Sequence, residues 1–371
     1  MSVTFLHTAD WQIGKLFGEL PYEKAIILQR ARLEAIQKIA AAGNKYSVDA
    51  ILVAGDIFEA DALKDETIRQ ALNAMSLFKG PWILLPGNHD PISEQCIWTR
   101  VNLLPEKTDN IILATKPEPI NLLDGRLIIL PAPLPYKHVY NDLTEWFDAY
   151  NVNNESYKVG LAHGAVEGEL FEKAEKYNLI SKNRVETARL DYLALGDWHG
   201  MYKISPRIFY SGTPEQDRFR DNNTGNALLV RLYKGHDPEI ERIPIGKYRW
   251  FKHDVKLYQQ EDVSTLNNYF NSIQSPESVI IKLNIQGLLS LSLRHELNMV
   301  LEKWNARLEY LFIVDDQLEI KQTDHEITEM KSSGFIGKVF NTLIDYKENS
   351  QGEEKKHAER AIQILWHEAQ K

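Results

Sequence analysis

The sequence predicts an α/β protein whose core of mixed sheets is covered by helices, followed by a small α+β domain and C-terminal helices. Over roughly the first 245 residues, short apolar runs alternate with helical stretches, which is typical of a sheet covered by helices. A second, shorter alternation follows, and two amphipathic stretches lie near the end. A length of 371 residues exceeds one ordinary domain. We therefore expect three parts, residues 1–246, 247–316 and 317–371.

The first part contains strand candidates that are short, mostly apolar and bounded by turns or helical stretches. They are Val3–His7, Ala50–Val53, Trp82–Leu85, Leu127–Leu130, Lys158–Ala162, Tyr192–Leu195, Ile208–Tyr210, Ala227–Leu232 and Glu239–Pro244. Apolar residues at helical spacing predict helices at Tyr22–Ala42, Ala62–Phe78 and Asn141–Tyr150. Binding sites in such folds lie at the carboxyl ends of the strands, so the residues after these runs are candidate site residues.

The second part alternates again, on a smaller scale. Strands are expected at Trp250–Val255, Ser278–Leu283 and Leu308–Val314, and helices at Ser264–Ser272 and Ser292–Trp304. Asp315–Met330 is rich in charge and has no clear period, which predicts a linker. Beyond it, Phe335–Ile344 and Ala361–Trp366 predict two amphipathic helices. Their apolar stripes fit either packing on the same chain or binding of a partner.

The charge balance limits the kinds of partner. The chain has 43 basic and 52 acidic residues, a formal net charge of -9, opposite in sign to a protein that binds nucleic acid by bulk charge. Carboxylates that hold divalent cations count as negative although they create local positive charge. The negative net charge therefore does not exclude a substrate that contains phosphate.

The cysteine content and the N-terminus indicate a cellular setting. The single cysteine, Cys96, excludes an intramolecular disulfide and a thiolate zinc cluster, and we expect it to be a small buried residue. A metal would need mainly oxygen and nitrogen ligands. No apolar run approaches the roughly 18 residues of a membrane span, and Met1–Phe5 lacks a basic signal region. These features predict a cytoplasmic protein.

Side chains able to bind metal follow five of the expected strands. Each alone has an ordinary explanation, because Asp caps helices and Asn-His occurs in turns. Accidental capping would not place only such side chains at one edge of a sheet, so together they predict a metal centre. They are Asp10, Asp56, Asn88-His89-Asp90, His163 and Asp197-Trp198-His199.

This series resembles the calcineurin-like metallophosphoesterases. Their hallmark is a Gly-Asp followed about thirty residues later by Gly-Asn-His-Asp or Gly-Asn-His-Glu, and this chain has Gly55-Asp56 and Gly87-Asn88-His89-Asp90. More narrowly, Leu6–Gly14, Val53–Phe58 and Tyr210–Pro214 are similar to the SbcD-type DNA repair exonucleases. The resemblance covers residues 1 to about 245 through these motifs and the remainder through architecture only.

The resemblance implies two divalent cations that clamp a phosphate and activate water for in-line attack. It also implies a partner for the leaving oxygen in His89, whose ring Asp90 would orient. The implied ligands are Asp56 as the bridge, Asp10, Gln12 and His199 at one cation, and Asn88, His163 and Asp197 at the other.

Two positions depart from the family pattern. Family members usually have Asp-x-His in the first motif and Gly-His-x-His in the last, whereas this chain has Gln12 and Asp197 at those places. The ligand set is therefore richer in oxygen, which favours Mn²⁺, or Mg²⁺, over Zn²⁺. Since an amide oxygen is neutral, we expect Gln12 to mark the weaker cation position.

The resemblance also implies a substrate and partners. SbcD-type proteins are DNA exo/endonucleases of double-strand-break processing that work with an SbcC-like coiled-coil ABC ATPase, bound through C-terminal helices, and a homodimer is expected. Two other functions stay open: a phosphatase or phosphodiesterase for a small molecule or phosphoprotein, and a catalytically weakened subunit that binds DNA and the ATPase. Candidate DNA contacts, otherwise solvated surface charges, are Lys182, Arg184, Arg218 and Arg220.

Overall fold

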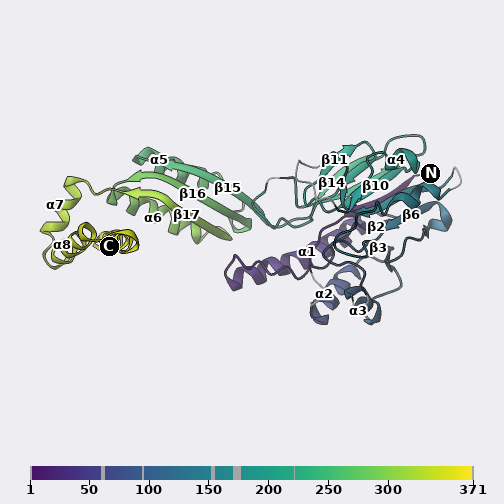
Figure 1. Ribbon diagram of the computed structural model, residues 1–371, viewed down its shortest axis with the longest axis horizontal. Helices are drawn as coiled ribbons and strands as arrows, with labels where there is room; N and C mark the ends of the chain where they lie inside the picture. The colour runs from purple at the N-terminus through teal and green to yellow at the C-terminus, as the bar shows by residue number, and fades with distance from the viewer. Residues whose placement is uncertain are drawn as a thin grey trace. The chain divides into compact units, whose positions relative to one another are not determined.

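The computed structural model describes residues 2–59, 63–93, 96–151, 155–169, 177–220 and 222–369. The chain forms two compact units, each with its own sheets (Figure 1). The first unit contains Met1–Asp217 and Asp221–Tyr248, and the second contains Arg218–Arg220 and Arg249–Lys371. Whether the C-terminal helices form a third, separate domain stays a prediction.

The first unit is built on two six-stranded sheets. In the first sheet, in the order β14-β13-β1-β2-β3-β4, the four strands from β1 to β4 run parallel, β13 pairs antiparallel with β1, and β14 pairs antiparallel with β13. Their bounds are β1 (Val3–Thr8), β2 (Ala50–Val53), β3 (Trp82–Leu84), β4 (Ile111–Leu113), β13 (Asn226–Leu232) and β14 (Glu239–Pro244).

The second sheet has the order β11-β12-β10-β7-β6-β5, and its four inner strands run parallel. Their bounds are β5 (Ile120–Leu122), β6 (Leu127–Ala132), β7 (Tyr157–His163), β10 (Tyr192–Gly196), β11 (Tyr202–Ser205) and β12 (Ile208–Tyr210). A short parallel pair, β8 (Ala165–Val166) and β9 (Leu179–Ile180), lies beyond β7.

The two sheets face each other across one apolar core. Phe5 and Leu52 from the first sheet pack in the same cluster as Val159, Leu161 and Ala194 from the second. Strand side chains alternate between the two faces of a sheet, so the neighbouring residues of each strand point the other way. Both faces must therefore be covered, which explains why these strands are apolar throughout.

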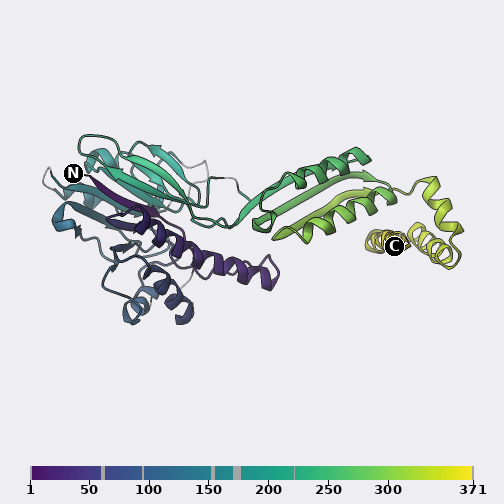
Figure 2. The ribbon, with the colours of Figure 1, turned by 180° about the vertical axis from the view of Figure 1, so that it is seen from behind.

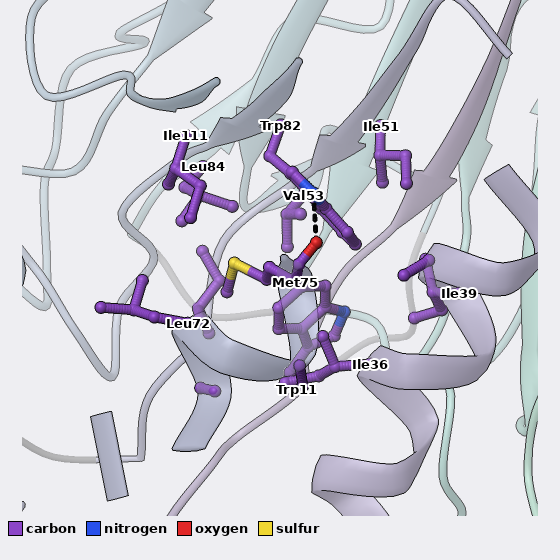
Figure 3. Close-up of a cluster of buried hydrophobic side chains, with 14 of the residues drawn as sticks. Trp11, Ile36, Ile39, Ile51, Val53, Leu72, Met75, Trp82, Leu84 and Ile111 are labelled. Carbon is purple, nitrogen blue, oxygen red and sulfur yellow. Dashed lines mark hydrogen bonds between the residues drawn. The ribbon is translucent and has the colours of Figure 1, made fainter. Parts of the chain in front are cut away.

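Helices cover the outer face of the first sheet. They are α1 (Tyr22–Lys45), α2 (Asp65–Met75) and α3 (Ile97–Leu103). Figure 3 shows Ile36 and Ile39 of α1 and Met75 of α2 packed against strand residues of this face. The indole of Trp82 donates a hydrogen bond to the Met75 carbonyl at 3.2 Å, which joins β3 to α2.

The outer face of the second sheet packs against η2 (Glu145–Ala149) and α4 (Arg184–Thr187). A further 3-10 turn, η1 (Leu123–Gly125), precedes β6.

The second unit is a three-stranded parallel sheet with two helices packed on it (Figure 2). Its strands are β15 (Arg249–Leu257), β16 (Val279–Leu289) and β17 (Tyr310–Ile320), its helices are α5 (Gln260–Asn271) and α6 (Leu291–Asn305), and η3 (Pro276–Ser278) precedes β16. Alternate strand residues, such as Ile281, Leu283 and Ile285, pack in one cluster with residues of both helices.

Three helices follow the sheet of the second unit: α7 (Asp324–Ser332), α8 (Gly334–Asn349) and α9 (Gly352–Ala369). Phe340, Ile362 and Trp366 are buried in one cluster with Leu291 of α6. Much of the apolar stripe of the C-terminal helices is thus used for packing within this unit. Among the described residues, no helix is both long enough and apolar enough to cross a bilayer.

The sequence misplaced several elements. The linker expected at Asp315–Met330 is wrong, because β17 stays paired with β16 to Ile320 and α7 begins at a capping box formed by Thr323 and Glu326. The helix expected at Asn141–Tyr150 is only the 3-10 turn η2. Ala62, the expected start of the second helix, lies outside the described residues. Cys96 is buried, as expected.

Candidate metal centre

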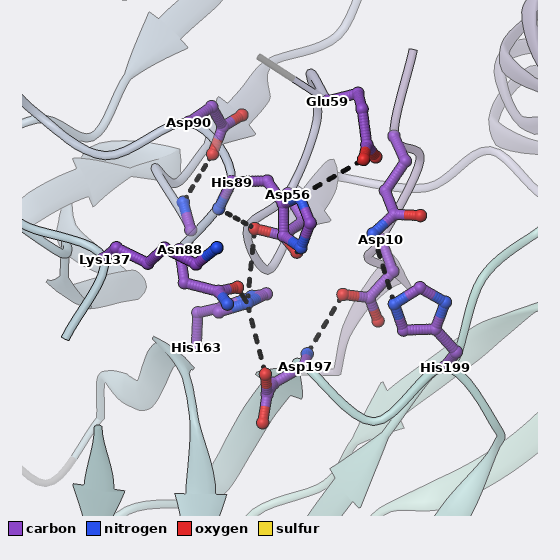
Figure 4. Close-up of polar contacts among 12 residues, drawn as sticks. Asp10, Asp56, Glu59, Asn88, His89, Asp90, Lys137, His163, Asp197 and His199 are labelled. Atoms are coloured by element: carbon purple, nitrogen blue, oxygen red, sulfur yellow. Dashed lines mark hydrogen bonds and ion pairs between the residues drawn. The ribbon is translucent and has the colours of Figure 1, made fainter. Parts of the chain in front are cut away.

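The candidate residues follow the carboxyl ends of strands from both sheets. Figure 4 shows that the side chains of Asp10, Asp56, Asn88, His163, Asp197 and His199 converge on one place. The first three follow β1, β2 and β3 of one sheet, and the others end or follow β7 and β10 of the opposite sheet. The centre therefore lies where the carboxyl edges of two sheets meet.

One side of the centre is formed by Asp10, Asp56 and His199, with Gln12 beside them; we call it the Gln12 side. Ligand atoms of the first three lie within 4.8 Å of one another. Oδ1 of Asp10 accepts a hydrogen bond from the Asp197 backbone at 3.0 Å. Oδ2 of Asp10 is buried and has no hydrogen-bond partner among the described residues. A buried carboxylate oxygen without a donor is costly, and a bound cation would satisfy it.

The other side is formed around His163 by Asp56, Asn88 and Asp197; we call it the His163 side. Nε2 of His163 lies 2.8 Å from Oδ1 of Asn88, 3.4 Å from Asp56 and 3.8 Å from Asp197. Its Nδ1 lies 2.8 Å from the carbonyl oxygen of Ala54. Both ring nitrogens thus face acceptors, which suits an imidazolium.

The electrostatics of the centre call for positive charge. Burial opposes a charged imidazole, yet Asp56, Asp10 and Asp197 raise the pKa of His163 to about 9. Burial raises the pKa of Asp10, and it raises the pKa of Asp197 to about 6. The proton on His163 supplies charge that a divalent cation would supply better. Asp10, Asp56 and His199 lie close enough together to hold a divalent cation, and Asp56 also faces His163 on the other side.

The backbone at the centre is unusual. Asp10, Gln12, Asp56 and Asp197 are non-glycine residues with positive φ, at 56°, 43°, 53° and 102°. Such conformations are costly and are kept where the surrounding structure demands them. They lie in the loops that follow β1, β2 and β10 and carry these four side chains.

Two glycines of the motifs make room for the ligands. A Cβ on Gly55 would lie 2.2 Å from the ring of His163, and a Cβ on Gly87 would lie 2.3 Å from Oδ1 of Asp56. Both distances are below any real contact, so the close approach of these ligands requires glycine.

His89 lies at the rim of the centre, next to a carboxylate that the sequence did not reveal. Its Nδ1 is 3.5 Å from Oε1 of Glu59, and its Nε2 is 3.9 Å from Oδ2 of Asp56. The hydrogen bond that His89 donates to Glu59 raises the pKa of His89. Glu59 follows Asp56 by three residues, but nothing in its spacing indicated the pairing.

Asp90 has a different place from the one expected. Its Oδ2 accepts hydrogen bonds from the backbone of Ile57 and Phe58 at 2.9 and 3.0 Å, and its Oδ1 accepts one from Gly87 at 2.7 Å. Burial raises the pKa of Asp90 to about 7. Asp90 therefore joins the loops after β2 and β3, and Glu59 is the carboxylate that meets His89.

Comparison with known proteins agrees with this geometry. Residues 3–239 match the family model described as calcineurin-like phosphoesterase. The chain belongs to this family. It is thus a metallophosphoesterase, a metal-dependent hydrolase of phosphoesters, and members of its family bind divalent metals. No curated protein matches the chain.

Solved structures show distant likenesses to this metallophosphoesterase. TT1561 of Thermus thermophilus is 14% identical with a TM-score of 0.40, over 65% of this chain and 99% of that one. The purple acid phosphatase PPD1 from yellow lupin (Lupinus luteus) seeds is 10% identical with a TM-score of 0.42, over 66% of this chain and 52% of that one.

Gln12 of the metallophosphoesterase is held by a charged network that the sequence did not reveal. Lys15 donates to its amide oxygen at 3.3 Å, and its amide nitrogen lies 3.3 Å from Nε2 of His199. Lys15 and Arg32 both bind the buried carboxylate of Asp217, at 2.5 and 2.9 Å. Asp217 also lies 3.7 Å from Nδ1 of His199. As a ligand, Gln12 would have to share its oxygen with an ammonium group.

The basic residues proposed as DNA contacts fall into three situations. Arg184 is buried and paired with Asp142 and Asp148 at 2.7 and 2.6 Å, so it fixes its own loop, and the expectation that it contacts DNA is wrong. Lys182 is exposed. Arg218 and Arg220 belong to the second unit.

Proposed function

We propose that this metallophosphoesterase is a metal-dependent DNA exo/endonuclease of double-strand-break processing that works with an SbcC-like ABC ATPase. The observation that carries the hydrolytic part is the convergence of carboxylates and imidazoles around Asp56. The DNA part is supported by the motifs that are similar to SbcD-type exonucleases.

One of these motifs, Tyr210–Pro214, lies against the centre. The hydroxyl of Tyr210 donates to the carbonyl of Gly164 at 2.8 Å, directly after His163. The backbone of Thr213 donates to the carbonyl of His199 at 2.9 Å. The motif thus supports the backbone next to His163 on one side of the centre and at His199 on the other.

The proposed cation positions follow the two sides of the centre. Asp10, Asp56 and His199 would hold one cation, with Gln12 as a weak fourth ligand. Asp56, Asn88, His163 and Asp197 would hold the other. When bound, such a pair neutralises the phosphate and lowers the pKa of the attacking water. The oxygen-rich set supports Mn²⁺, with Mg²⁺ as the alternative.

His89 has the chemistry of the proton donor. The oxygen that leaves phosphorus gains negative charge in the transition state, and an adjacent imidazolium stabilises it by donating a hydrogen bond and then the proton. The hydrogen bond to Glu59 raises the pKa of His89, which favours the protonated form. The place of His89 at the rim, outside both proposed ligand sets, leaves it available for this step.

The proposed partners rest on the C-terminal helices and on resemblance. Although most apolar residues of α8 and α9 are used for packing, Phe335 is 80% exposed and Ile364 is 55% exposed. These side chains are the proposed contacts for the ATPase. A homodimer and a cytoplasmic setting complete the proposal, the latter supported by the single cysteine.

Degradation of end-labelled linear DNA in Mn²⁺ tests this function. Wild type is compared with His89→Ala, once equal melting temperatures show that both proteins are equally well folded. The proposal expects cleavage by wild type that is lost with a chelator and strongly reduced in the variant. Cleavage of nitrophenyl phosphate esters alone would support a small-molecule phosphatase. Binding of DNA without turnover would support a non-catalytic subunit.

A further inference from the structure

Exposed aromatic side chains gather on the segment after β6, where they meet Tyr177. Tyr140 is 77% exposed, and Tyr136 on the same segment is 70% exposed. The ring centroid of Tyr177 lies 4.6 Å from that of His138 and 4.9 Å from that of Tyr140, in tilted and edge-on packing. Most of the Tyr140 ring therefore stays accessible to a ligand. We call His138, Tyr140 and Tyr177 the aromatic cluster.

Asn178 fixes the aromatic cluster against the end of β7. Its side-chain amide donates to the Lys137 carbonyl and accepts from the Val139 backbone, both at 2.9 Å. Its own carbonyl accepts a hydrogen bond from Ala165 at 3.1 Å. A Cβ on Gly164 would lie 2.1 Å from that carbonyl oxygen. Asn178 is therefore packed directly against the residue that follows a candidate ligand, and it places the cluster beside the metal centre.

The same segment is tied to the loop that carries His89. The backbone of Ile92 donates to the Leu134 carbonyl at 2.9 Å. Between these two anchors, the exposed side chain of Lys137 extends toward the centre (Figure 4), and its charge acts on the His89 imidazole. A cation at this place suits a phosphate that approaches a centre rich in carboxylates.

We propose that the aromatic cluster and Lys137 form a substrate subsite that stacks unpaired nucleobases of the strand being cut, while Lys137 contacts its phosphate. The inference rests on the proposed function. Aromatic rings with open faces stack any base, and neighbouring cations bind the backbone. Because Asn178 already holds the backbone on both sides of His138, this segment loses little freedom on binding. The subsite therefore favours frayed or single-stranded ends over closed duplex.

The test compares Tyr140→Ala with Tyr140→Phe, which keeps the ring. Tyr22→Ala is the matched control, because Tyr22 is 79% exposed at the start of α1. The substrates are a single-stranded oligonucleotide and the same strand with abasic residues around the cleaved bond. We expect Tyr140→Ala to raise KM for the normal strand about tenfold with kcat nearly unchanged. Tyr140→Phe and Tyr22→Ala stay near wild type, and the abasic strand shows no difference between variants.

The outcomes separate this inference from the proposed function. Equal KM values of wild type and Tyr140→Ala on the normal strand, or an equal loss on the abasic strand, would overturn the subsite alone. Loss of self-association in Tyr140→Ala with unchanged DNA kinetics would assign the cluster to contacts between copies and also overturn it. A wild type that hydrolyses nitrophenyl esters but neither binds nor cuts DNA would overturn the proposed function, and the subsite with it.

Discussion

The two sides of the metal centre are built on different principles. On the His163 side, imidazole, amide and carboxylate groups face one another directly, and a proton on His163 holds them together. On the Gln12 side, the amide of Gln12 is occupied by Lys15, which is in turn bound to Asp217. The comparison teaches that a side chain placed at the centre can already be engaged by a cation of the protein itself, as Gln12 is by Lys15. It predicts unequal affinities for the two proposed cations.

The largest effect is expected where the two sides share a residue. Asp56→Asn removes the charge common to both, so we expect the rate of phosphodiester hydrolysis to fall roughly a thousandfold or more and Mn²⁺ binding to weaken on both sides. Calorimetric titration with Mn²⁺ and steady-state kinetics measure this. Weakening on one side alone would show that Asp56 does not bridge. Asp315→Asn, at an ion pair of the second unit, is the matched control.

A substitution of His89 can distinguish an effect on proton transfer from an effect on cation binding. His89→Gln should lower kcat by roughly a hundredfold or more and leave Mn²⁺ affinity unchanged on both sides.

Glu59→Gln should lower kcat less than His89→Gln does. Because Glu59 raises the pKa of His89 and the protonated form is the donor, its loss should move the alkaline limb of the kcat profile to lower pH. An unmoved limb would remove Glu59 from the proton step.

The Gln12 side can be weakened through a residue that contacts no proposed cation. Asp217→Asn should reduce Mn²⁺ affinity on the Gln12 side by about tenfold, because Lys15 and His199 both lose their shared carboxylate. The His163 side should keep its affinity. Equal loss on both sides would mean that the substitution merely loosened the fold, which the melting temperature without metal would show independently.

The smallest effect concerns stability against pH in the metal-free protein. The pKa of His163 is about 9 in the folded chain against an ordinary value of 6.5, and the pKa of Asp197 is about 6 against 3.8. In both cases the folded state holds the proton more tightly, so stability present at low pH is lost as pH rises through these values. We expect the melting temperature to fall by a few degrees between pH 6 and 9, and Mn²⁺ to remove this slope. A rise without metal would contradict the charge assignment.

The sequence could locate the centre but not its supporting contacts. Asp10, Asp56, Asn88 and His163 were visible because each comes directly after a short apolar strand, and parallel strands end at one edge. Asp217 was invisible, since its partners Lys15 and Arg32 are far away along the chain and only the tertiary fold brings them together.

Proximity in sequence also misled in two places. Asp90 is adjacent to His89 in the sequence, but the oxygens of Asp90 accept hydrogen bonds from the backbone of two loops. The carboxylate that contacts the His89 ring is that of Glu59. The second half of β17 was mistaken for a linker because its side chains are charged and largely exposed, while its order comes from backbone pairing with β16. Pairing through backbone hydrogen bonds alone produces no apolar pattern in the sequence by which the strand could be predicted.

Anomalous diffraction from crystals soaked in Mn²⁺ tests the central claim most directly, because it places each cation without reference to activity. The account predicts two peaks per chain, both in contact with the Asp56 carboxylate. The peak between Asn88, His163 and Asp197 should be stronger at low Mn²⁺ than the peak beside Asp10 and His199. A single peak, or two peaks that do not share Asp56, would contradict it.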